Sequence, residues 1–413
     1  MRSPGLKEDS KNLSLIGGSA LLALVVTGGL WAGLTTVRPQ HIHVEHVVAP
    51  LPITVTLGPV SGSNRLYGRV ITRSGQELTG YIRWDRNEGS WSDLLDANKM
   101  TGSRGAAVSG IRFGHINRID VSGRESALFT LKSGEQVEMG ARATDLGSGL
   151  RALVVDDARG GRAELAWRDL ETVEFQPAPE ALTTMEGRIH GTLATASGME
   201  FTGYVAWDVD EIYTSDVLDG EQDGYDREVP FGAIASIHRN GSGSARVVLH
   251  DGQELVLSGT NDVDDSNSGI SVSDLALGQI KVDWDDFDAV RFHEPETEPG
   301  YGLFDGGRLI QGTVVTESGE QLVGEIQWDN DETHTWEMLN GDAGGVDFQI
   351  EFGQIAQIRK TDRGSVIVLR DGRTFELSGS NDVDGDNRGI TVLMDGGSQQ
   401  IEWEDFAELH LIH

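Results

Sequence analysis

Cysteine is absent from the 413 residues of this chain. Its absence excludes disulfide bonds, thiolate metal sites, iron–sulfur clusters, covalently attached haem and cysteine nucleophiles. Basic residues are few beside the acidic ones, and the formal net charge is −33. Nucleic acids and anionic lipid surfaces carry charge of the same sign, so neither is expected as a partner. Either the charge serves only solubility, or it complements cations or basic protein surfaces.

Motifs of catalysis are missing as well. The chain has no Gly-Lys dipeptide and therefore no phosphate-binding loop of the usual type. It also has no H-E-x-x-H and no G-x-S-x-G pattern. Carboxylates are so abundant that a pair of them carries no information about a hydrolase. We therefore expect a protein that is not an enzyme and has no small-molecule substrate.

Long apolar runs are missing except for one, at residues 13–37. This run is long enough to cross a hydrocarbon core of about 30 Å, and it is longer than the apolar region of about 7–15 residues in a secretory signal. We expect an uncleaved transmembrane anchor. The basic residues of the preceding tail, 1–12, place that tail in the cytoplasm. The sequence thus predicts a single-pass protein of the cytoplasmic (inner) membrane, with everything after the anchor periplasmic or extracellular.

One further feature lies within this anchor and another directly follows it. Gly29 and Gly33 form a G-x-x-x-G pair, which lets a second membrane helix approach closely. Residues 38–65 contain four prolines and read as an extended, semi-rigid tether. The anchor therefore offers a contact to a neighbouring membrane subunit.

What the chain does have is a phrase that occurs three times, G-x-x-x-x-G-x-x-x-W-D, with a further glycine seven residues earlier. The copies lie about 120 residues apart, which indicates one structural unit used three times. We expect tandem repeats of about 115 residues at 66–176, 185–293 and 308–413. The phrase comprises Gly75, Gly80, Trp84 and Asp85; Gly198, Gly203, Trp207 and Asp208; and Gly319, Gly324, Trp328 and Asp329, and the earlier glycines are Gly68, Gly191 and Gly312.

Inside the repeats the apolar pattern has period two. Residues 313–316 and 322–328 read as two strands around a turn at 317–320, and residues 366–369 and 375–377 read as another hairpin around Asp-Gly. After the anchor no stretch shows a sustained amphipathic helical pattern. The sequence predicts an all-β fold.

Each repeat also looks double. A turn glycine is followed ten residues later by an Asp in both halves, and each half ends in a strand of similar type, at 350–355 and 401–406 in the third repeat. Six tryptophans occupy these landmarks, which favours core packing over a ligand-stacking platform. They are Trp84, Trp207 and Trp328 on second strands, and Trp167, Trp284 and Trp403 on closing strands.

The half-units resemble small Sm-like or SH3-like β-barrels. The resemblance rests on a hairpin of the form h-x-h-x-x-x-G-x-x-x-x-G-x-h-x-x-D, followed by a loop and an h-x-h-x-x-I-x-x-I closing strand, where h is apolar. It covers most of 66–413 and implies the fold alone. The RNA binding known for Sm-like proteins conflicts with the acidity of this chain.

Two acidic loops offer a candidate metal site. Alternating Asp residues are the spacing that a hard cation such as calcium uses in a loop. Asn, Asp and Gly are also ordinary turn formers, so a plain β-loop is the second interpretation. The residues concerned are Asp262, Asp264 and Asp265 in one loop and Asp382, Asp384 and Asp386 in the other.

Three functions fit these observations. The leading hypothesis is a structural subunit that braces a larger bacterial membrane complex from the periplasmic side, with respiratory, secretion and photosynthetic reaction-centre or light-harvesting assemblies as possible hosts. The second is an envelope binding module for peptides, glycans or calcium, which requires the second-strand tryptophans to lie in solvent. The third is a surface adhesin or stalk.

Overall fold

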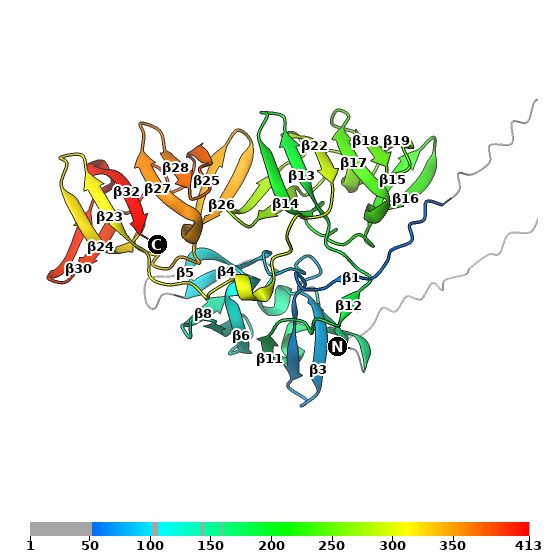
Figure 1. The fold of residues 1–413 in the computed structure, drawn as a ribbon, viewed down its shortest axis with the longest axis horizontal. Coiled ribbons are helices and arrows are strands. Elements are labelled where there is room, and N and C mark those ends of the chain that lie inside the picture. The colour runs from blue at the N-terminus through cyan, green and yellow to red at the C-terminus, as the bar shows by residue number, and fades with distance from the viewer. Residues whose placement is uncertain (1–51, 101–105, 142–143, 158–159, 413) are drawn as a thin grey trace, which may run out of the picture. The chain divides into compact units, whose positions relative to one another are not determined.

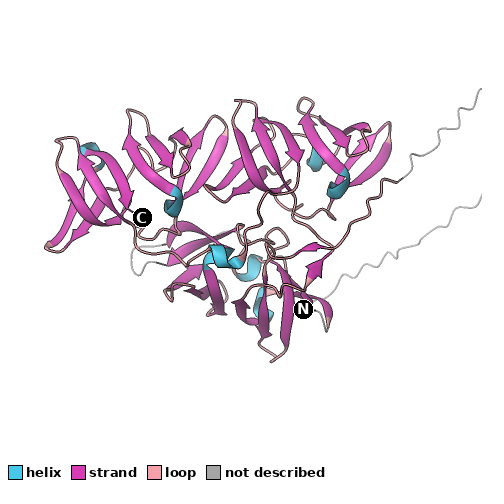
Figure 2. Cartoon of the chain, in the orientation of Figure 1, coloured by secondary structure: helices cyan, strands magenta, loops and turns pink. Residues whose placement is uncertain are grey.

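Antiparallel strands make up nearly all the regular structure in the computed structural model of this chain (Figures 1 and 2). The structure describes residues 52–100, 106–141, 144–157 and 160–412. Within these residues the helical elements are single 3₁₀ turns, and no helix is long and apolar enough to cross a membrane. The predicted all-β class is confirmed. The predicted anchor at 13–37, with Gly29 and Gly33, and the tail at 1–12 lie outside the described residues.

The strands fall into three sets with the same order along the chain. The first set is β2 (Tyr67–Thr72), β3 (Glu77–Arg83), β4 (Leu94–Met100), β5 (Ala106–Arg112), β6 (Ile116–Val121), β7 (Ser126–Leu131), β8 (Gln136–Gly140), β9 (Leu153–Asp157), β10 (Gly161–Leu165) and β11 (Leu170–Phe175). The second set is β13 (His190–Thr195), β14 (Glu200–Ala206), β15 (Val217–Gln222), β16 (Tyr225–Pro230), β17 (Ile234–Arg239), β18 (Ser244–Leu249), β19 (Glu254–Ser258), β20 (Ile270–Asp274), β21 (Gly278–Val282) and β22 (Phe287–Phe292).

The third set is β23 (Gln311–Thr316), β24 (Gln321–Gln327), β25 (Met338–Ala343), β26 (Val346–Glu351), β27 (Ile355–Lys360), β28 (Ser365–Leu369), β29 (Thr374–Leu377), β30 (Ile390–Met394), β31 (Gly397–Ile401) and β32 (Phe406–Ile412). We call these sets repeats 1, 2 and 3. A short pair, β1 (Val60–Ser61) with β12 (Thr183–Thr184), joins the segment before repeat 1 to the segment before repeat 2.

The strand geometry explains why glycine recurs at these positions. In each repeat two of them face each other across the first hairpin, as Gly312 faces Gly324 between β23 and β24. A Cβ on Gly324 would lie 2.1 Å from the carbonyl oxygen of Leu393 on β30, and one on Gly312 would lie 2.7 Å from that of His410 on β32. A side chain would therefore block the close approach of neighbouring strands. Gly319, in the hairpin turn, has φ of +85°, which favours glycine.

Strand pairing shows how each repeat is doubled. The strands of repeat 2 pair in the order β21-β20-β14-β13-β22-β17-β18-β19-β15-β16, and repeats 1 and 3 follow the same order. In repeat 3 the step from β29 to β25 is a single bridge between Asp342 and Ser378. The centre of repeat 2 is the β17–β22 pair, in which Ile237 lies opposite Val290.

The two halves of a repeat exchange hairpins. In repeat 2 the first half supplies β13 to β17 and the second half supplies β18 to β22. The β15–β16 hairpin of the first half pairs with β19 of the second half, while the β20–β21 hairpin of the second half pairs with β14 of the first. Each set of five neighbouring strands is thus built from both halves, which the sequence pattern did not indicate.

The closing strands also differ from the prediction. Residues 350–355 comprise the end of β26, a 3₁₀ turn at Phe352–Gln354 (η8) and the start of β27. Residues 401–406 likewise contain the turn η9 (Trp403–Asp405) before β32. The chain passes here from the second strand of a hairpin to a strand near the centre of its repeat, and a straight strand cannot make that step. The remaining 3₁₀ turns are η2 (Phe113–His115), η3 (Gly147–Gly149), η4 (Trp167–Asp169), η5 (Phe231–Ala233), η6 (Asn261–Val263) and η7 (Tyr301–Leu303).

The landmark tryptophans lie in the core, as predicted. Trp84, Trp207 and Trp328 are fully buried, and the three closing-strand tryptophans are at most 8% exposed. Trp207 packs edge-to-face on Trp284 at 6.2 Å between ring centroids, and Trp328 packs on Trp403 at 6.1 Å. The requirement of the binding-module hypothesis, second-strand tryptophans in solvent, is therefore not met.

Repeats 2 and 3 share one continuous sheet and one hydrophobic core. Strand β21 at the edge of repeat 2 pairs with β26 of repeat 3, with buried Ile280 opposite buried Phe348. At the equivalent positions of strands that end their sheets, β31 carries Gln399 and β16 carries Arg227. Polar and charged side chains on an edge oppose pairing with a further strand. The strands that end the sheet of repeat 1 carry apolar residues at the equivalent positions, Ala163 on β10 and Val108 on β5, so the buried pair stabilises this junction but does not by itself determine which repeats join.

Candidate functional site

Every second strand ends in the same tight loop, W-D-x-[D/N]-E. The backbone N–H of Trp328 donates to the carbonyl of Glu332, and the N–H of Glu332 donates back to the carbonyl of Trp328. Asp329 and Asn330 between them have φ of +44° and +64°. Asp and Asn tolerate this left-handed conformation better than most residues. The equivalent loops are residues 84–88 in repeat 1 and 207–211 in repeat 2.

The Asp of each Trp-Asp pair is buried and holds a later loop of its own repeat. In repeat 3 the backbone N–H of Arg388 donates to Oδ1 of Asp329, and the Arg388 guanidinium donates to Oδ2. In repeat 2 the residue in this place is Ser268, whose N–H donates to Asp208. The carboxylate thus closes the second strand against the loop that precedes β20 or β30.

A second Asp accepts a hydrogen bond from the tryptophan side chain. The indole Nε1 of Trp328 donates to the carbonyl oxygen of Asp382 at 2.9 Å, and Oδ2 of Asp382 accepts the backbone N–H of Asn340 at 2.7 Å. Asp145 and Asp262 do the same in repeats 1 and 2. Burial raises the pKa of Asp382 from 3.8 to about 6 and that of Asp145 to about 8.

A buried glutamate completes each loop. Oε2 of this glutamate is buried and has no hydrogen-bond partner among the described residues in any of the three repeats. Burial, followed by repulsion from neighbouring carboxylates, raises its pKa; for Glu211 the value is about 9. The three glutamates are Glu88, Glu211 and Glu332, each four residues after its tryptophan.

The six Asp residues proposed for calcium separate into different roles. Asp262 and Asp382 are buried against the tryptophans, as described above. Asp264 and Asp384 accept backbone N–H groups two residues later in the chain, which is the bonding of an ordinary Asp turn. Asp265 and Asp386 are exposed. Calcium binding by the alternating loop stays a prediction.

Instead, the described carboxylates converge in two other groups. Ligand atoms of Asp208, Asp210 and Glu211 lie within 4.8 Å of one another, and so do those of Asp329, Glu332 and Asp382. Only Asp382 belongs to both the predicted set and these groups. The glutamate could have been found from the sequence, because it follows the Trp-Asp pair at the same distance in all three repeats.

A third acidic position, nine residues after each tryptophan, links the repeats to one another. Its carboxylate accepts two backbone N–H groups of its own loop and also contacts a basic side chain of a different repeat. In repeat 1, Oδ2 of Asp93 accepts from Gly89 and Ser90, while Oδ1 lies 2.8 Å from the guanidinium of Arg188 in repeat 2. Both partners of this ion pair are almost fully buried.

The same kind of contact between repeats is found at this position in repeats 2 and 3. Asp216 of repeat 2 lies 3.1 Å from Arg83 of repeat 1, and Glu337 of repeat 3 contacts Lys99 of repeat 1. Burial alone would raise the pKa of Glu337, but His334 and Lys99 bring it below its ordinary value. We call Asp93, Asp216 and Glu337 the linking carboxylates. Their basic partners do not recur at equivalent positions, so no sequence pattern could indicate them.

One arginine contacts all three repeats. Arg112 of repeat 1 donates to the carbonyl oxygens of Asp274 and Leu275 in repeat 2, at 3.2 and 3.1 Å. Its Nε also lies 3.0 Å from Oε2 of Glu351 in repeat 3, at an angle that makes the contact an ion pair and not a hydrogen bond. Arg112 and Glu351 are almost fully buried. Trp336 of repeat 3 adds an apolar contact, because it packs in the core cluster of repeat 1.

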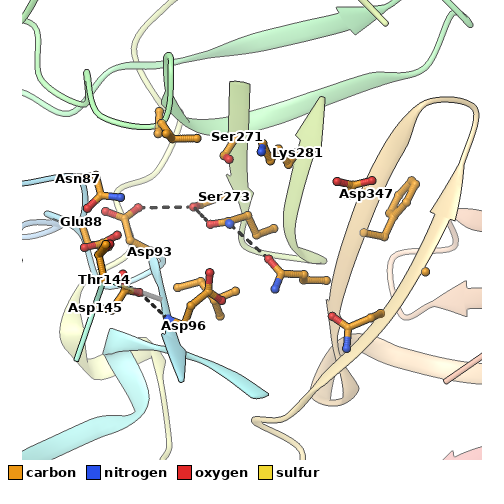
Figure 3. Close-up of a pocket in the computed structure, with 18 of the residues that line it drawn as sticks. Asn87, Glu88, Asp93, Asp96, Thr144, Asp145, Ser271, Ser273, Lys281 and Asp347 are labelled. Carbon is orange, nitrogen blue, oxygen red and sulfur yellow. Dashed lines mark hydrogen bonds between the residues drawn. The ribbon is translucent and has the colours of Figure 1, made fainter. Parts of the chain in front are cut away.

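A polar cavity of about 520 Å³ lies where the three repeats meet (Figure 3). Glu88, Asp93 and Asp145 line it from repeat 1, Ser273 from repeat 2 and Asp347 from repeat 3. Ser273 donates to Asp93 at 3.4 Å, and this bond crosses from repeat 2 to repeat 1. Carboxylates outnumber basic side chains on the wall, so the cavity favours water or a cation over an anion.

The buried glutamates predict a pH dependence. The folded-state pKa of Glu211 is raised from 4.5 to about 9, so the unfolded chain releases this proton at lower pH than the folded protein. The stability that this group contributes is therefore complete below pH 4.5 and is lost as the pH rises toward about 9, by at most about 1.4 kcal/mol per pH unit. Glu211→Gln should flatten this part of the profile, measured by urea unfolding across the range.

The control for this experiment is Glu180→Gln, because Glu180 is exposed. Its pH profile should follow that of the wild type. A Glu211→Gln profile as steep as the wild-type profile would contradict the prediction.

Comparison of the chain with family models, with curated proteins and with solved structures finds no match.

Proposed function

We propose that this protein is a non-enzymatic, membrane-anchored structural subunit that stabilises a larger bacterial membrane complex from the periplasmic side. The observation that carries the proposal is the set of linking carboxylates. All three repeats use the same loop position to bind a basic residue of another repeat. The Asp93–Arg188 pair is almost fully buried and the other two pairs are largely shielded from solvent. Such pairs favour one arrangement of the repeats, because separating them would leave poorly solvated charges without a partner.

A fixed arrangement suits a brace. A chain of independent modules can bind several partners but transmits little force between them, whereas repeats locked together hold their contact surfaces at set positions. Individually modest contacts to several subunits then add up, since one anchor makes each further contact effectively intramolecular. The acidic surface would meet basic faces of the partner subunits.

The finer architecture belongs to the same proposal. We take each group of five neighbouring strands as one Sm-like or SH3-like barrel, so that each repeat holds two. The antiparallel order of the five strands in each group supports this assignment. The anchor at 13–37 would place the protein in the inner membrane, with the G-x-x-x-G face of Gly29 and Gly33 against a neighbouring helix.

The test compares the full chain with a variant that keeps the anchor but lacks residues 66–413. Mass spectrometry of the full-length protein, purified natively from detergent-solubilised membranes, identifies the host complex. Deletion is expected to lower the resistance of that complex to heat and detergent, while its activity per intact complex stays the same. The host could be a respiratory, secretion or photosynthetic assembly.

An equally robust complex that has lost a specific activity would contradict the proposal and point to a catalytic or electron-transfer role. Purification without any membrane subunit would contradict the proposal and favour a binding module that does not use the buried tryptophans, with the acidic cavity as its site. A matched control keeps all the repeats and exchanges only Arg168, an exposed residue, for methionine.

A further inference from the structure

Three carboxylates of repeat 3 lie together inside the protein. Asp329, Glu332 and Asp382 are 0%, 5% and 3% exposed, and a ligand oxygen of each lies within 4.8 Å of those of the other two. They come from two distant parts of the chain, because the loop after β24 supplies the first two and the loop before β30 supplies the third. Three buried charges of one sign at this separation repel one another strongly unless something compensates them.

The compensation within the protein is incomplete. Arg388 contacts Asp329 and Asp331, and its side chain is half exposed. Asp382 accepts from the backbone and side chain of Asn340. Oε2 of Glu332, by contrast, is buried and has no hydrogen-bond partner among the residues that the structure describes. A buried oxygen without a donor is costly, and it is the atom that a bound cation would satisfy.

We propose that Asp329, Glu332 and Asp382 bind one hard divalent cation, with calcium as the best match. All the side chains offered are oxygen ligands, which suit calcium or magnesium and not the softer metals that select nitrogen or sulfur. Magnesium requires near-ideal octahedral geometry at short distances, whereas calcium accepts irregular sets of carboxylates. The loops that supply these ligands are fastened by the tryptophan and by β25, so the ligands are held in place before the ion binds.

The other repeats carry acidic residues at the same three positions but do not bring them together in the same way. The equivalent residues are Asp85, Glu88 and Asp145 in repeat 1 and Asp208, Glu211 and Asp262 in repeat 2. Among the described residues, repeat 2 instead groups Asp208, Asp210 and Glu211, with Asp210 also paired with Arg151 of repeat 1, and the carboxylates of repeat 1 form no such group. The site of repeat 3 is therefore distinguished by the close approach of its three carboxylates and not by its composition.

The decisive experiment titrates calcium into the metal-free full chain in detergent, for the wild type and three variants. Glu332→Gln removes the charged ligand while conserving shape, and it should weaken binding at the repeat 3 site at least tenfold. Asp386→Asn, in the exposed part of the same loop, should leave binding unchanged. Glu211→Gln should leave the repeat 3 site unchanged as well. Circular dichroism without calcium should show Glu332→Gln folded, because the variant removes a buried acidic group.

Terbium gives a second readout that does not depend on any variant. The indole Nε1 of Trp328 donates a hydrogen bond to the carbonyl oxygen of Asp382, so the ring lies close enough to the site to sensitise terbium luminescence. Calcium should reduce this signal by displacing the terbium. No sensitised signal and no calcium heat from the wild type would overturn the proposal. Binding that survives Glu332→Gln would overturn it too, and loss in Asp386→Asn equal to that in Glu332→Gln would assign the ion to the alternating Asp loop. None of these results depends on whether the host complex exists.

Discussion

Trp207→Ala is expected to destabilise repeat 2 by about 3–5 kcal/mol, which is the range for truncating a large buried aromatic. Trp207 is fully buried, packs edge-to-face on Trp284 and Phe287, and donates from Nε1 to the carbonyl of Asp262 at 2.8 Å. Alanine would leave both a cavity and an unsatisfied carbonyl in the core. Because Asp262 also caps the N–H of Asp219, the loss should extend to β15.

Urea unfolding of the full chain, combined with hydrogen exchange of β13, β14 and β15, measures this effect. Met185→Ala is the matched control, since Met185 is 53% exposed and its truncation should cost little. A loss below about 1 kcal/mol for Trp207→Ala would contradict the core role of these tryptophans.

The second large effect is expected from Arg112→Met. Removing one partner of a buried ion pair leaves the other charge uncompensated, at a cost of about 3–5 kcal/mol. Here the charge left behind is Glu351, and the carbonyl oxygens of Asp274 and Leu275 lose their donors as well. The damage should appear as separation of repeat 1 from repeats 2 and 3 before the unfolding of any repeat, since Arg112 links repeat 1 to the other two, which share one sheet. Limited proteolysis at the segments between repeats reports this separation.

The pH dependence gives this variant a distinctive signature. In the wild type, burial would raise the pKa of Glu351, but Arg112 and then His115 bring it below its ordinary value. Without Arg112 the largest contact that lowers the pKa of Glu351 is lost, so this pKa should rise. The stability difference between the wild type and Arg112→Met should therefore be smaller at acidic pH than at neutral pH. Arg168→Met, at a residue that is 86% exposed, is the control. Equal stability of the two variants at neutral pH would contradict the role of Arg112.

Most of the fold that could be predicted was predicted from short-range sequence patterns. The glycine and tryptophan spacing placed the first hairpin of every repeat, because a turn that needs positive φ and a pair of strands that approach closely both demand glycine at set positions. The period-two pattern placed β23, β24, β28 and β29. The acidic loop before β30 contributes Asp382 to the group of carboxylates that the fold brings together, whereas Asp329 and Glu332 come from the loop after β24. Glu332 was missed although its spacing recurs.

What the sequence by itself determined is the repeated unit: an all-β chain with three copies of a hairpin, a buried tryptophan and an acidic loop. These features depend on residues that are close in the sequence, because strand alternation and turn geometry are determined by neighbours within a few positions. The exchange of hairpins between halves, the apolar junction of Ile280 with Phe348 and the partners of the linking carboxylates were decided only by tertiary structure. Their physical reason is the same in each case, because burying an edge strand or a charge requires a partner from a distant part of the chain, and local pattern does not specify which one.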